Sequence, residues 1–371
     1  MKVTAAGVRR YRVHAQQLDR ATRPDRAPGD ADVLDLGVQD TGPDGALWAL
    51  AVRGVPVTAA HWPHEIALAW TLRGAPHAYR RADLRDVERT LRPYSEVDAA
   101  KRVLNAARPL KAAGIPVTEA LATTARTMRE VVTEPLAKGE LSTRMTARMP
   151  EPYLRWCEAC QATHMYEMPF RLAALHAGLE LGPGTAPPVV RRIPGWPSAQ
   201  VGALARSEKD DGRLDPIRGL LRLLGPVTAK QVAAYLDAPV KDVLARWPSD
   251  AVTVQVDGAD ADLLEGDLDA LHDAADTDVV RLLGAYDLYL QGGDRRLVVP
   301  DTARHPSLWQ SLGRPGAVLA GGEIVGTWRP RARGKSLGIE LDEWLPWDAA
   351  TRDAVETEHG RLAAFRGLEP V

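Results

Sequence analysis

The sequence lacks the features that would place the protein in a membrane or outside the cell. It has no stretch of about eighteen uncharged apolar residues, which excludes a transmembrane helix. The first 20 residues are charged throughout and do not resemble the apolar segment of a signal peptide. Only two cysteines occur in 371 residues, which argues against a disulfide framework and for a reducing interior. We therefore expect a soluble cytoplasmic protein of two or three domains.

Strong net charge is also missing, but the charges are unevenly distributed along the chain. The net charge is −2, yet residues 257–278 contain nine acidic residues and no Lys or Arg. Residues 1–26 carry seven basic groups against two acidic ones, and residues 295–335 carry eight against two. Such segregation can give a neutral protein a basic face that binds phosphates. The excess of Arg over Lys is weaker support, because a GC-rich genome gives the same bias.

The clearest local pattern lies between residues 215 and 258. Apolar spacing predicts helices over 217–224, 229–236 and 240–247, and Thr228 is placed to cap the second. Residues 252–256 alternate like a strand and end at a turn. Three helices followed by a strand and a turn are the order of a winged helix, whose hairpin can lie on the nucleic-acid backbone.

Weaker patterns predict two more units of this kind upstream and a β region downstream. The other predicted helices cover 66–73, 82–91, 117–136, 141–149, 153–181 (two helices broken near Pro169) and 349–365. The predicted strands of the β region lie at 298–299, 317–319, 324–328 and 337–341. The expected division is three winged-helix units, 1–110, 111–190 and 198–278, followed by residues 279–371 with an Arg-bearing hairpin turn and the final helix.

Three consecutive polar residues follow an apolar run near the start of the chain. Gln39, Asp40 and Thr41 supply an amide, a carboxylate and a hydroxyl just before Gly42-Pro43. A strand end can hold such groups rigidly against a reacting atom, because its neighbours fix the rotamers. The same residues are also ordinary turn chemistry, so their function depends on the rest of the chain.

The two cysteines form a C-x-x-C pattern, Cys157 and Cys160, with His164 four residues further on. No second ligand pair follows and no thioredoxin-like βαβ unit surrounds them. On the helix predicted there the cysteines share an apolar face, so we expect packing rather than metal binding. The segment 61–65 has two His and a Glu, but its proline disrupts the helical spacing of such zinc motifs. We expect no metal and no cofactor.

Four blocks occur in a characteristic order along the chain. They are Leu36-Gly37-Val38-Gln39 with Trp48-Ala49-Leu50 and Arg53; Trp70-Thr71-Leu72-Arg73-Gly74-Ala75-Pro76-His77; Arg281-Leu282-Leu283-Gly284-Ala285-Tyr286-Asp287 with Gly293-Asp294-Arg295-Arg296; and Gly326-Thr327-Trp328-Arg329. With them the chain resembles the winged-helix DNA glycosylase superfamily of AlkZ and YcaQ. The resemblance implies an α+β, mainly α fold: tandem winged-helix units in a C shape around DNA, with a small C-terminal β-sheet or barrel region.

The resemblance also implies the catalytic positions. The family motif is Gln, an apolar residue, then Gln or Asp; Gln39 matches its first position, but Asp40 stands at the apolar position and Thr41 at the third. Either Asp40 supplies the carboxylate from a shifted backbone, or Thr41 does a weaker version of the task, or activity is lost. We favour Asp40. A strict strand would direct Asp40 away from Gln39 and Thr41, so the chain must bend at Gln39.

These residue types suit cleavage of an N-glycosidic bond. The reaction passes through an oxocarbenium-like sugar, which a carboxylate stabilises while it activates a water that an amide can orient. Lys2 is the only lysine in the first hundred residues, which favours a hydrolase without lyase activity. Altered motifs of this type look like the self-resistance glycosylases of bacteria that make bulky DNA-alkylating antibiotics. The resemblance therefore implies excision of bulky alkylated purines of the N7-alkylguanine type.

The expected partner is double-stranded DNA carrying alkylated bases, bound by a monomer that does not contact membranes. The Gly-Gly-Asp-Arg-Arg segment 292–296 is predicted to be a hairpin turn that enters a groove. The predicted DNA-binding residues are Arg73, His77, Arg80, Arg81, Arg295, Arg296, Arg329 and Arg331. A non-catalytic winged-helix DNA-binding protein, either a regulator or a protein that sequesters adducts, is the alternative.

Overall fold

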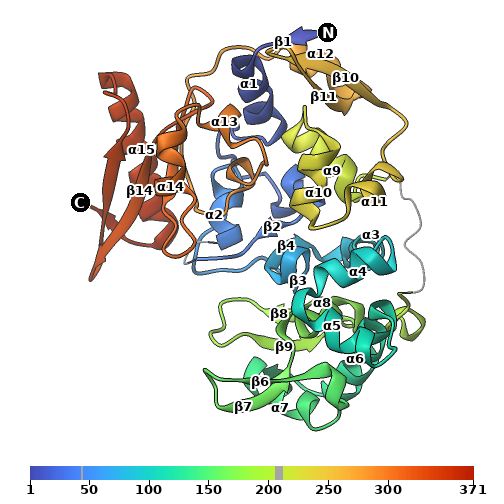
Figure 1. The fold of residues 1–371 in the computed structure, drawn as a ribbon. Coiled ribbons are helices and arrows are strands. Elements are labelled where there is room, and N and C mark those ends of the chain that lie inside the picture. The colour runs from blue at the N-terminus through green and yellow to red at the C-terminus, as the bar shows by residue number, and fades with distance from the viewer. Residues whose placement is uncertain (43–44, 205–211) are drawn as a thin grey trace. The chain divides into compact units, whose positions relative to one another are not determined.

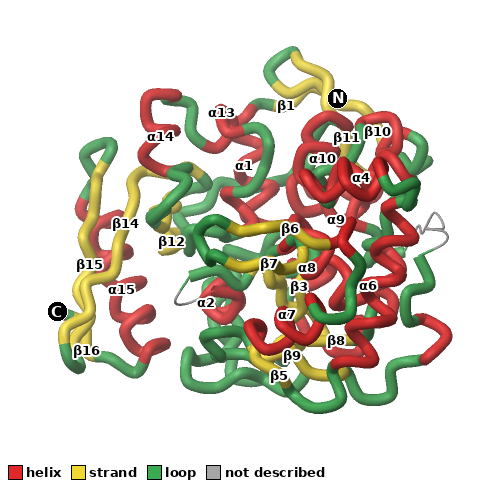
Figure 2. The backbone as a smooth tube through the Cα atoms, turned by 60° about the horizontal axis from the view of Figure 1, so that its bottom comes forward, coloured by secondary structure: helices red, strands yellow, loops and turns green. Residues whose placement is uncertain are grey.

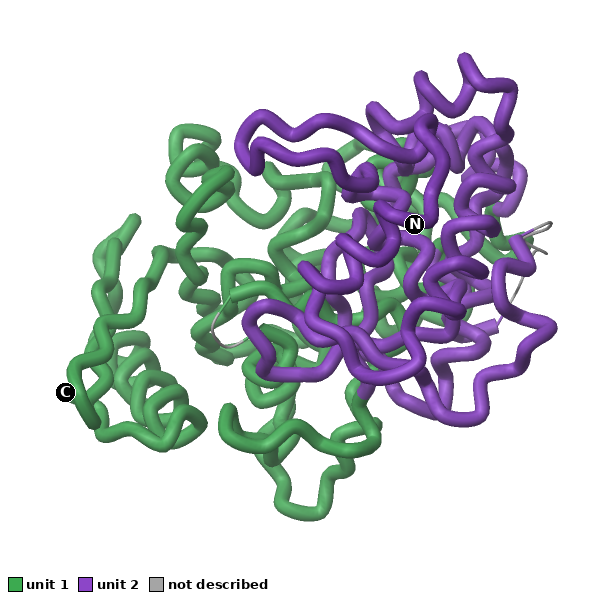
Figure 3. Tube along the Cα trace, turned by 90° about the horizontal axis from the view of Figure 1, so that it is seen from below, with its two compact units in different colours: residues 1–66, 217–235, 247–371 green, residues 67–216, 236–246 purple. Residues whose placement is uncertain are grey.

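The computed structural model describes residues 1–42, 45–204 and 212–371. They form two compact units, of which unit 1 comprises residues 1–66, 217–235 and 247–371, and unit 2 residues 67–216 and 236–246 (Figures 1 and 3). Both units contain helices and strands, so the predicted mixed class is confirmed. Among the described residues, no helix is long and apolar enough to cross a membrane.

Unit 1 is built around two sheets. Its strands are β1 (Lys2–Val3), β2 (Val38–Gln39), β10 (Ala251–Val256), β11 (Ala259–Leu264), β12 (Val280–Leu283), β13 (Gly316–Ala320), β14 (Glu323–Arg333), β15 (Ser336–Glu343) and β16 (Glu369–Pro370). Its helices are α1 (Ala5–Ala15), α2 (Gly45–Ala51), α9 (Pro216–Leu224), α10 (Ala229–Leu236), α12 (Leu268–His272), α13 (Arg295–Val298), α14 (His305–Leu308) and α15 (Ala349–Arg366). One sheet has the order β1-β10-β11, with β1 parallel to β10, and the other runs from β12 to β16 in sequence order.

The core of unit 1 lies between the five-stranded sheet and helices α2 and α15. Trp48 on α2 is fully buried, and its indole N–H donates to the Leu282 carbonyl at 2.7 Å. The Trp48 ring also contacts Phe365 on α15, with 5.1 Å between ring centroids. The N–H of a buried tryptophan usually finds a hydrogen-bond partner, and that of Trp48 does so here. These contacts fix α2 to both the sheet and the final helix.

A buried ion pair joins two of the four sequence blocks. Arg53 donates to both carboxylate oxygens of Asp287, at 2.7 and 2.8 Å, and neither side chain is exposed. Arg53 also donates to Gln16 at 3.1 Å, and Asp287 accepts from the backbone N–H of Tyr289 at 3.0 Å. Bidentate geometry and these additional bonds offset the cost of removing both charges from water. Arg53 and Asp287 therefore link the residues that follow α2 to those that follow β12.

The β14–β15 hairpin, labelled in Figure 2, is buried along part of its length and exposed at its tip. Trp328, near the middle of β14, is buried, and its N–H donates to the Leu283 carbonyl at 2.9 Å. Beyond it, Arg331 and Arg333 are exposed, and the strands join at Gly334 and Lys335. The inner part of the hairpin belongs to the core, whereas its tip, residues 331–335, is basic and faces solvent.

Unit 2 combines a sheet with a group of helices. Its helices are α3 (Leu84–Thr90), α4 (Glu96–Arg102), α5 (Ala107–Ala112), α6 (Val117–Val131), α7 (Lys138–Thr146), α8 (Glu167–His176) and α11 (Val240–Leu244). Its strands are β3 (Ile66–Trp70), β4 (Pro76–Arg80), β5 (Leu136–Ala137), β6 (Leu154–Cys157), β7 (Ala162–Met165), β8 (Leu179–Gly182) and β9 (Val189–Arg192). Within the unit the sheet order is β4-β3-β8-β9-β5, and β6 and β7 form a separate hairpin.

Helix α6 shows why the helices of unit 2 form where the sequence predicts them. Ala120, Leu121, Thr124, Ala125 and Met128 are buried, a spacing that puts one apolar face against α8.

Most predicted helices are observed with shorter or shifted ends, because terminal turns depend on capping more than on the apolar pattern. The confirmed helices correspond to α3, α6, α7, α8, α9, α10, α11 and α15. The strands predicted at 252–256, 317–319, 324–328 and 337–341 are also confirmed.

Three secondary-structure predictions are wrong. Residues 66–70 form strand β3 instead of a helix; all five are buried, and a short continuous apolar run has no periodicity that separates the two states. Residues 154–165 form the β6–β7 hairpin instead of a helix, because its turn contains neither Gly nor Pro to mark it. Residues 298–299 end the short helix α13 instead of forming a strand.

Candidate functional site

The Gln39-Asp40-Thr41 motif lies where strand β2 ends and before helix α2 begins. Gln39 is the last residue of β2, and the chain turns at Gly42, whose φ is 93°. The Gln39 side-chain amide donates to Thr41 Oγ1 at 3.0 Å. Gln39 and Thr41 therefore lie together, as residues two apart on an extended chain do. The predicted turn extends to Pro43, which lies outside the described residues.

The Asp40 side chain is directed to the start of helix α2. Its Oδ1 accepts a hydrogen bond from the Ala46 backbone N–H at 2.8 Å. Burial raises the pKa of the Asp40 carboxyl above its ordinary value of 3.8, and the Ala46 bond opposes that shift. A carboxylate has about four lone-pair positions, so one backbone bond leaves capacity for a water molecule. Asp40, the residue between Gln39 and Thr41, thus carries a partly buried carboxylate in a fixed orientation.

Gly45, the first residue of α2, makes this orientation possible. A Cβ at Gly45 would lie 1.9 Å from Asp40 Oδ1 and 2.9 Å from its Cγ. Both distances are far below van der Waals contact, so any larger residue would displace the carboxylate. The φ of Gly45 is 43°, a conformation that other residues adopt at a cost. The sequence pattern did not identify this glycine, because it acts only through its contact with Asp40.

The block from Trp70 to His77 forms the turn between strands β3 and β4 in unit 2. Arg73 has a φ of 55° and lines a pocket with Trp70, Met168 and His176. His77 is fully buried, with Nδ1 3.0 Å from both the Ala75 carbonyl and Thr71 Oγ1. Burial, followed by the nearby Arg73 charge, lowers the pKa of His77 to about 3. His77 therefore stabilises the turn as a neutral ring, and contact with DNA would require the turn to open.

Arg80 and Arg81 follow directly after this turn and make ion pairs within unit 2. The Arg80 guanidinium lies 3.5 Å from Asp83, and Arg81 donates to Glu180 at 2.6 Å. Glu180 also accepts from Arg191 at 2.9 Å, so one buried carboxylate serves two guanidinium groups. Both Arg80 and Arg81 remain partly exposed, which leaves part of each side chain accessible to a phosphate.

The Gly-Gly-Asp-Arg-Arg segment is not the hairpin turn that was predicted. It leads into helix α13, which begins at Arg295, and Asp294 forms an ion pair with Arg12 at 2.5 Å. Glycines followed by Asp suit a helix entry as well as a hairpin turn, and here the helix forms. Arg295 and Arg296 are nevertheless exposed, and the Arg295 guanidinium lies 4.8 Å from the centre of the Trp309 ring.

The β14–β15 hairpin carries Arg329 and Arg331. Arg329 is partly buried and donates to the Gly313 carbonyl at 2.6 Å, whereas Arg331 is exposed and forms an ion pair with Glu340 on the opposite strand. Arg333 and Lys335 at the tip were counted in the basic segment but not predicted as DNA contacts. Both are exposed. The register places Arg333 and Lys335 at the end of a two-stranded ribbon, and this position makes them candidate DNA contacts. The sequence alone does not give the register.

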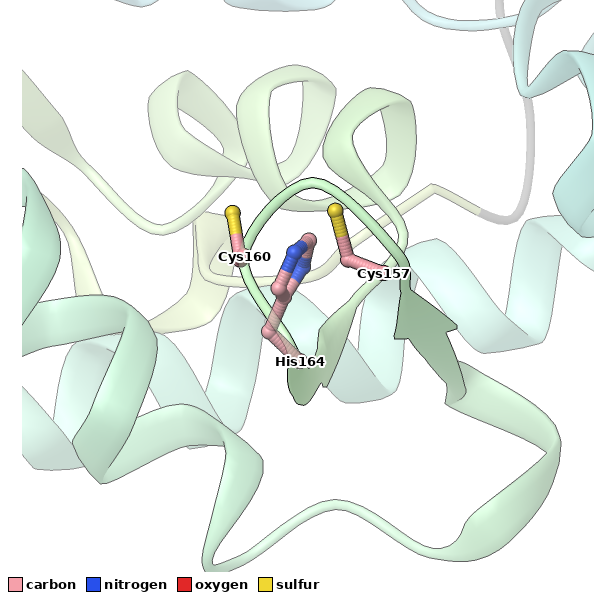
Figure 4. A group of neighbouring side chains, drawn as sticks. All are labelled: Cys157, Cys160 and His164. Carbon is pink, nitrogen blue, oxygen red and sulfur yellow. The ribbon is translucent and has the colours of Figure 1, made fainter.

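Cys157, Cys160 and His164 are brought together by the β6–β7 hairpin (Figure 4). The predicted packing on an apolar helix face is wrong, because no helix forms there and Cys160 is exposed. One ligand atom from each of the three residues lies within 4.8 Å of the others.

Comparison with known proteins gives the class of the protein, a DNA glycosylase. The profile of the family described as DNA glycosylase AlkZ-like matches residues 33–365, and the chain belongs to this family. The fold is similar to that of the DNA glycosylase AlkZ from Streptomyces sahachiroi, with a TM-score of 0.68 and 19% sequence identity over 100% of both chains. Curated protein sequences give no significant match. The family resemblance of the four blocks and the prediction of a DNA glycosylase are confirmed.

Proposed function

We propose that this DNA glycosylase hydrolyses the N-glycosidic bond of bulky alkylated purines, of the N7-alkylguanine type, at a site formed by Gln39, Asp40 and Thr41. The observation that carries the proposal is the pairing of Gln39 with Thr41, together with a carboxylate on the residue between them that the start of helix α2 holds in place. An amide, a hydroxyl and a carboxylate at one strand end can bind a water molecule and a developing positive charge together.

In the proposed reaction Asp40 has two tasks. Its negative charge stabilises the oxocarbenium-like sugar, and it accepts a proton from the attacking water as the C1′–N9 bond breaks. The water attacks C1′ from the face opposite the departing base. Gln39 and Thr41 orient that water, because both offer donors and acceptors in a fixed relation. An N7-alkylated guanine leaves without prior protonation, so no separate general acid is needed.

The solvent exposure of the motif supports a bulky lesion as the substrate. Gln39, Asp40 and Thr41 are all partly exposed, and Gly42 is exposed. Asp40 thus lies near the protein surface, where a large adduct could remain between the base pairs while its sugar approaches the carboxylate. A deep pocket would require the whole modified nucleotide to rotate out of the duplex. The altered motif and this accessibility support a role in self-resistance to DNA-alkylating antibiotics.

DNA binding is assigned to exposed or partly exposed basic residues of each unit. In unit 1 these are Arg295, Arg296 and the hairpin tip, and in unit 2 they are Arg80 and Arg81. Along the chain, helices α9, α10 and α11 are followed by the β10–β11 hairpin, which is the order of a winged helix. The proposal therefore keeps a winged helix at residues 198–278, with α11 assigned to unit 2 and the other four elements to unit 1. The tandem winged-helix arrangement in a C shape is part of this proposal, and the protein would act as a monomer.

Single-turnover cleavage tests the proposal. A duplex with one bulky N7-alkylguanine is incubated with excess protein, and heat with alkali then reveals abasic sites. We expect Asp40→Asn to slow base release by about 10²- to 10⁴-fold, the range for loss of a general base. Asn keeps an oxygen that can accept from Ala46, so the variant should fold. Gln39→Ala and Thr41→Val should also slow release, because each removes a group that orients the water. If Asp40→Asn released the base at the wild-type rate, the catalytic site would have to lie elsewhere in the protein.

A further inference from the structure

We propose that the β6–β7 hairpin binds a zinc ion through Cys157, Cys160 and His164. The chain has only two cysteines, and both lie in this hairpin. Their ligand atoms and one imidazole nitrogen lie within 4.8 Å of one another. In a tetrahedral site with Zn–S about 2.3 Å and Zn–N about 2.0 Å, ligand atoms lie about 3.5–3.8 Å apart. Side-chain rotations that move the ligand atoms by about 1 Å would therefore bring them to the distances of a zinc site.

The register of the hairpin explains why these residues meet. His164 pairs with Arg155, and Arg155 lies two residues before Cys157 on the same strand. Residues two apart on a strand share a face, and so do residues directly opposite each other, so His164 and Cys157 lie on one face as a diagonal pair. Cys160 comes from the turn, which continues through Gln161 with a φ of 48°. In Figure 4 the imidazole lies between the two sulfur atoms.

The tautomer of His164 is set by its backbone. Nδ1 lies 2.9 Å from the carbonyl oxygen of Met165. A carbonyl can only accept, so Nδ1 carries the hydrogen and Nε2 presents its lone pair. Histidines that bind zinc are held in the same way, with the other ring nitrogen donating to a carbonyl or carboxylate. Nε2 is therefore ready to bind a metal without a change of tautomer.

The chemistry of the ligands selects the ion. Two thiolates and an imidazole favour zinc, whereas magnesium and calcium prefer oxygen ligands. Cys160 is exposed and Cys157 and His164 are partly exposed, so a metal can reach all three. With three protein ligands the fourth position would take a water molecule. A two-stranded hairpin has little stability of its own, and Trp156 within it is 53% exposed, so the ion would serve to hold the hairpin together.

Cobalt titration of the full-length, untagged, reduced protein tests this site. After EDTA treatment, Co²⁺ should give a sulfur-to-cobalt charge-transfer band at one equivalent, and Zn²⁺ should displace it. Since there are no other cysteines, that band can come only from this hairpin. Zinc should also protect both thiols from alkylation. Cys157→Ser, Cys160→Ser and His164→Asn should each weaken zinc binding by more than the about 10- to 100-fold that loss of a ligand's hydrogen-bond partner costs.

The matched control is His272→Asn, which removes an exposed histidine from unit 1 and should leave zinc affinity unchanged. Circular dichroism confirms that each variant folds, and Cys160→Ser, which alters only an exposed turn residue, keeps the test valid if Cys157→Ser unfolds. The proposal is overturned if no charge-transfer band forms. It is also overturned if all variants bind zinc equally, or if the cysteines form a disulfide in the presence of reductant and zinc.

Discussion

Gly45→Ala should inactivate the enzyme without changing any group that reacts. The new Cβ would lie 1.9 Å from Asp40 Oδ1, and the carboxylate is the end of a rotatable side chain. The side chain must therefore turn away, and its 2.8 Å hydrogen bond to the Ala46 N–H is lost. If Asp40 is the base, we expect base release to slow by about 10²- to 10⁴-fold, as for its removal.

The cost in stability separates into two parts. A residue other than glycine in a left-handed conformation costs about 1–2 kcal/mol. Loss of a hydrogen bond to a charged group adds about 1.5–3 kcal/mol. Gly114→Ala is the matched control, because Gly114 has a φ of 71° but nothing within 4 Å of the added Cβ. Gly114→Ala should lower the free energy of unfolding only by the cost of the left-handed conformation, and it should keep full activity. Urea denaturation measures both variants.

The decisive assay is single-turnover base release from the N7-alkylguanine duplex, at a temperature where both variants are fully folded. Gly45→Ala should be slow and Gly114→Ala should match the wild type. Equal rates in the two variants would show that the position of the Asp40 carboxylate does not matter for catalysis. Asp40 would then be a residue that caps helix α2, and Thr41 would remain as the residue that acts with Gln39.

Three further predictions concern stability and DNA binding. Asp287→Ala should lower the free energy of unfolding by about 3–5 kcal/mol, because it leaves the Arg53 charge buried and unpaired. His77 has a pKa of about 3 when folded against its ordinary 6.5, so the unfolded chain binds the extra proton. Stability should fall as pH drops below 6.5, by up to about 1.4 kcal/mol per pH unit, and His77→Asn should flatten that slope. Arg333→Ala and Lys335→Ala should each reduce the slope of log affinity for DNA against log salt by about 1.

Each of these has a control. Replacing both members of the buried pair, Arg53→Met with Asp287→Leu, should cost less than Asp287→Ala alone, and an equal loss would contradict the account of an unpaired charge. His272→Asn should keep the wild-type pH slope between 6.5 and 4.5. Arg352→Ala removes an exposed arginine that pairs with Glu343 on unit 1 and should leave the salt dependence unchanged. Equal effects of Arg352→Ala and Arg333→Ala would remove the hairpin tip from the DNA interface.

Much of the helical framework could be predicted from the sequence, because amphipathic spacing records which face is buried. Helix α6 is an example, with its buried residues three and four apart. Strand β3 could not be predicted, since a strand buried on both sides shows no alternation. The β6–β7 hairpin was missed because its turn, residues 158–161, has no glycine or proline, and its residue of positive φ is Gln161.

For the candidate site, residue types were easier to predict than orientations. The motif and the turn at Gly42 are visible in the sequence, whereas the predicted bend at Gln39 is not observed, because Gln39 ends a strand. The hydrogen bond from Ala46 to Asp40 depends on where helix α2 begins. His77 and Arg73 share one block, yet one is buried and the other lines a pocket. Which of Asp40 and Thr41 acts with Gln39 in catalysis stays a prediction for the variants above.

Unit 1 is formed by three separate segments of the chain, and this affects when it can fold during synthesis. Trp48, which anchors the helix behind the motif, contacts Leu282 and Phe365, more than 200 and 300 residues later. A ribosome that adds about 5–20 residues per second completes those partners only many seconds after the motif has emerged. Residues 67–216 of unit 2 are complete well before then. Catalytic competence should therefore appear only after α15 has been synthesised and has packed against the Trp48 ring.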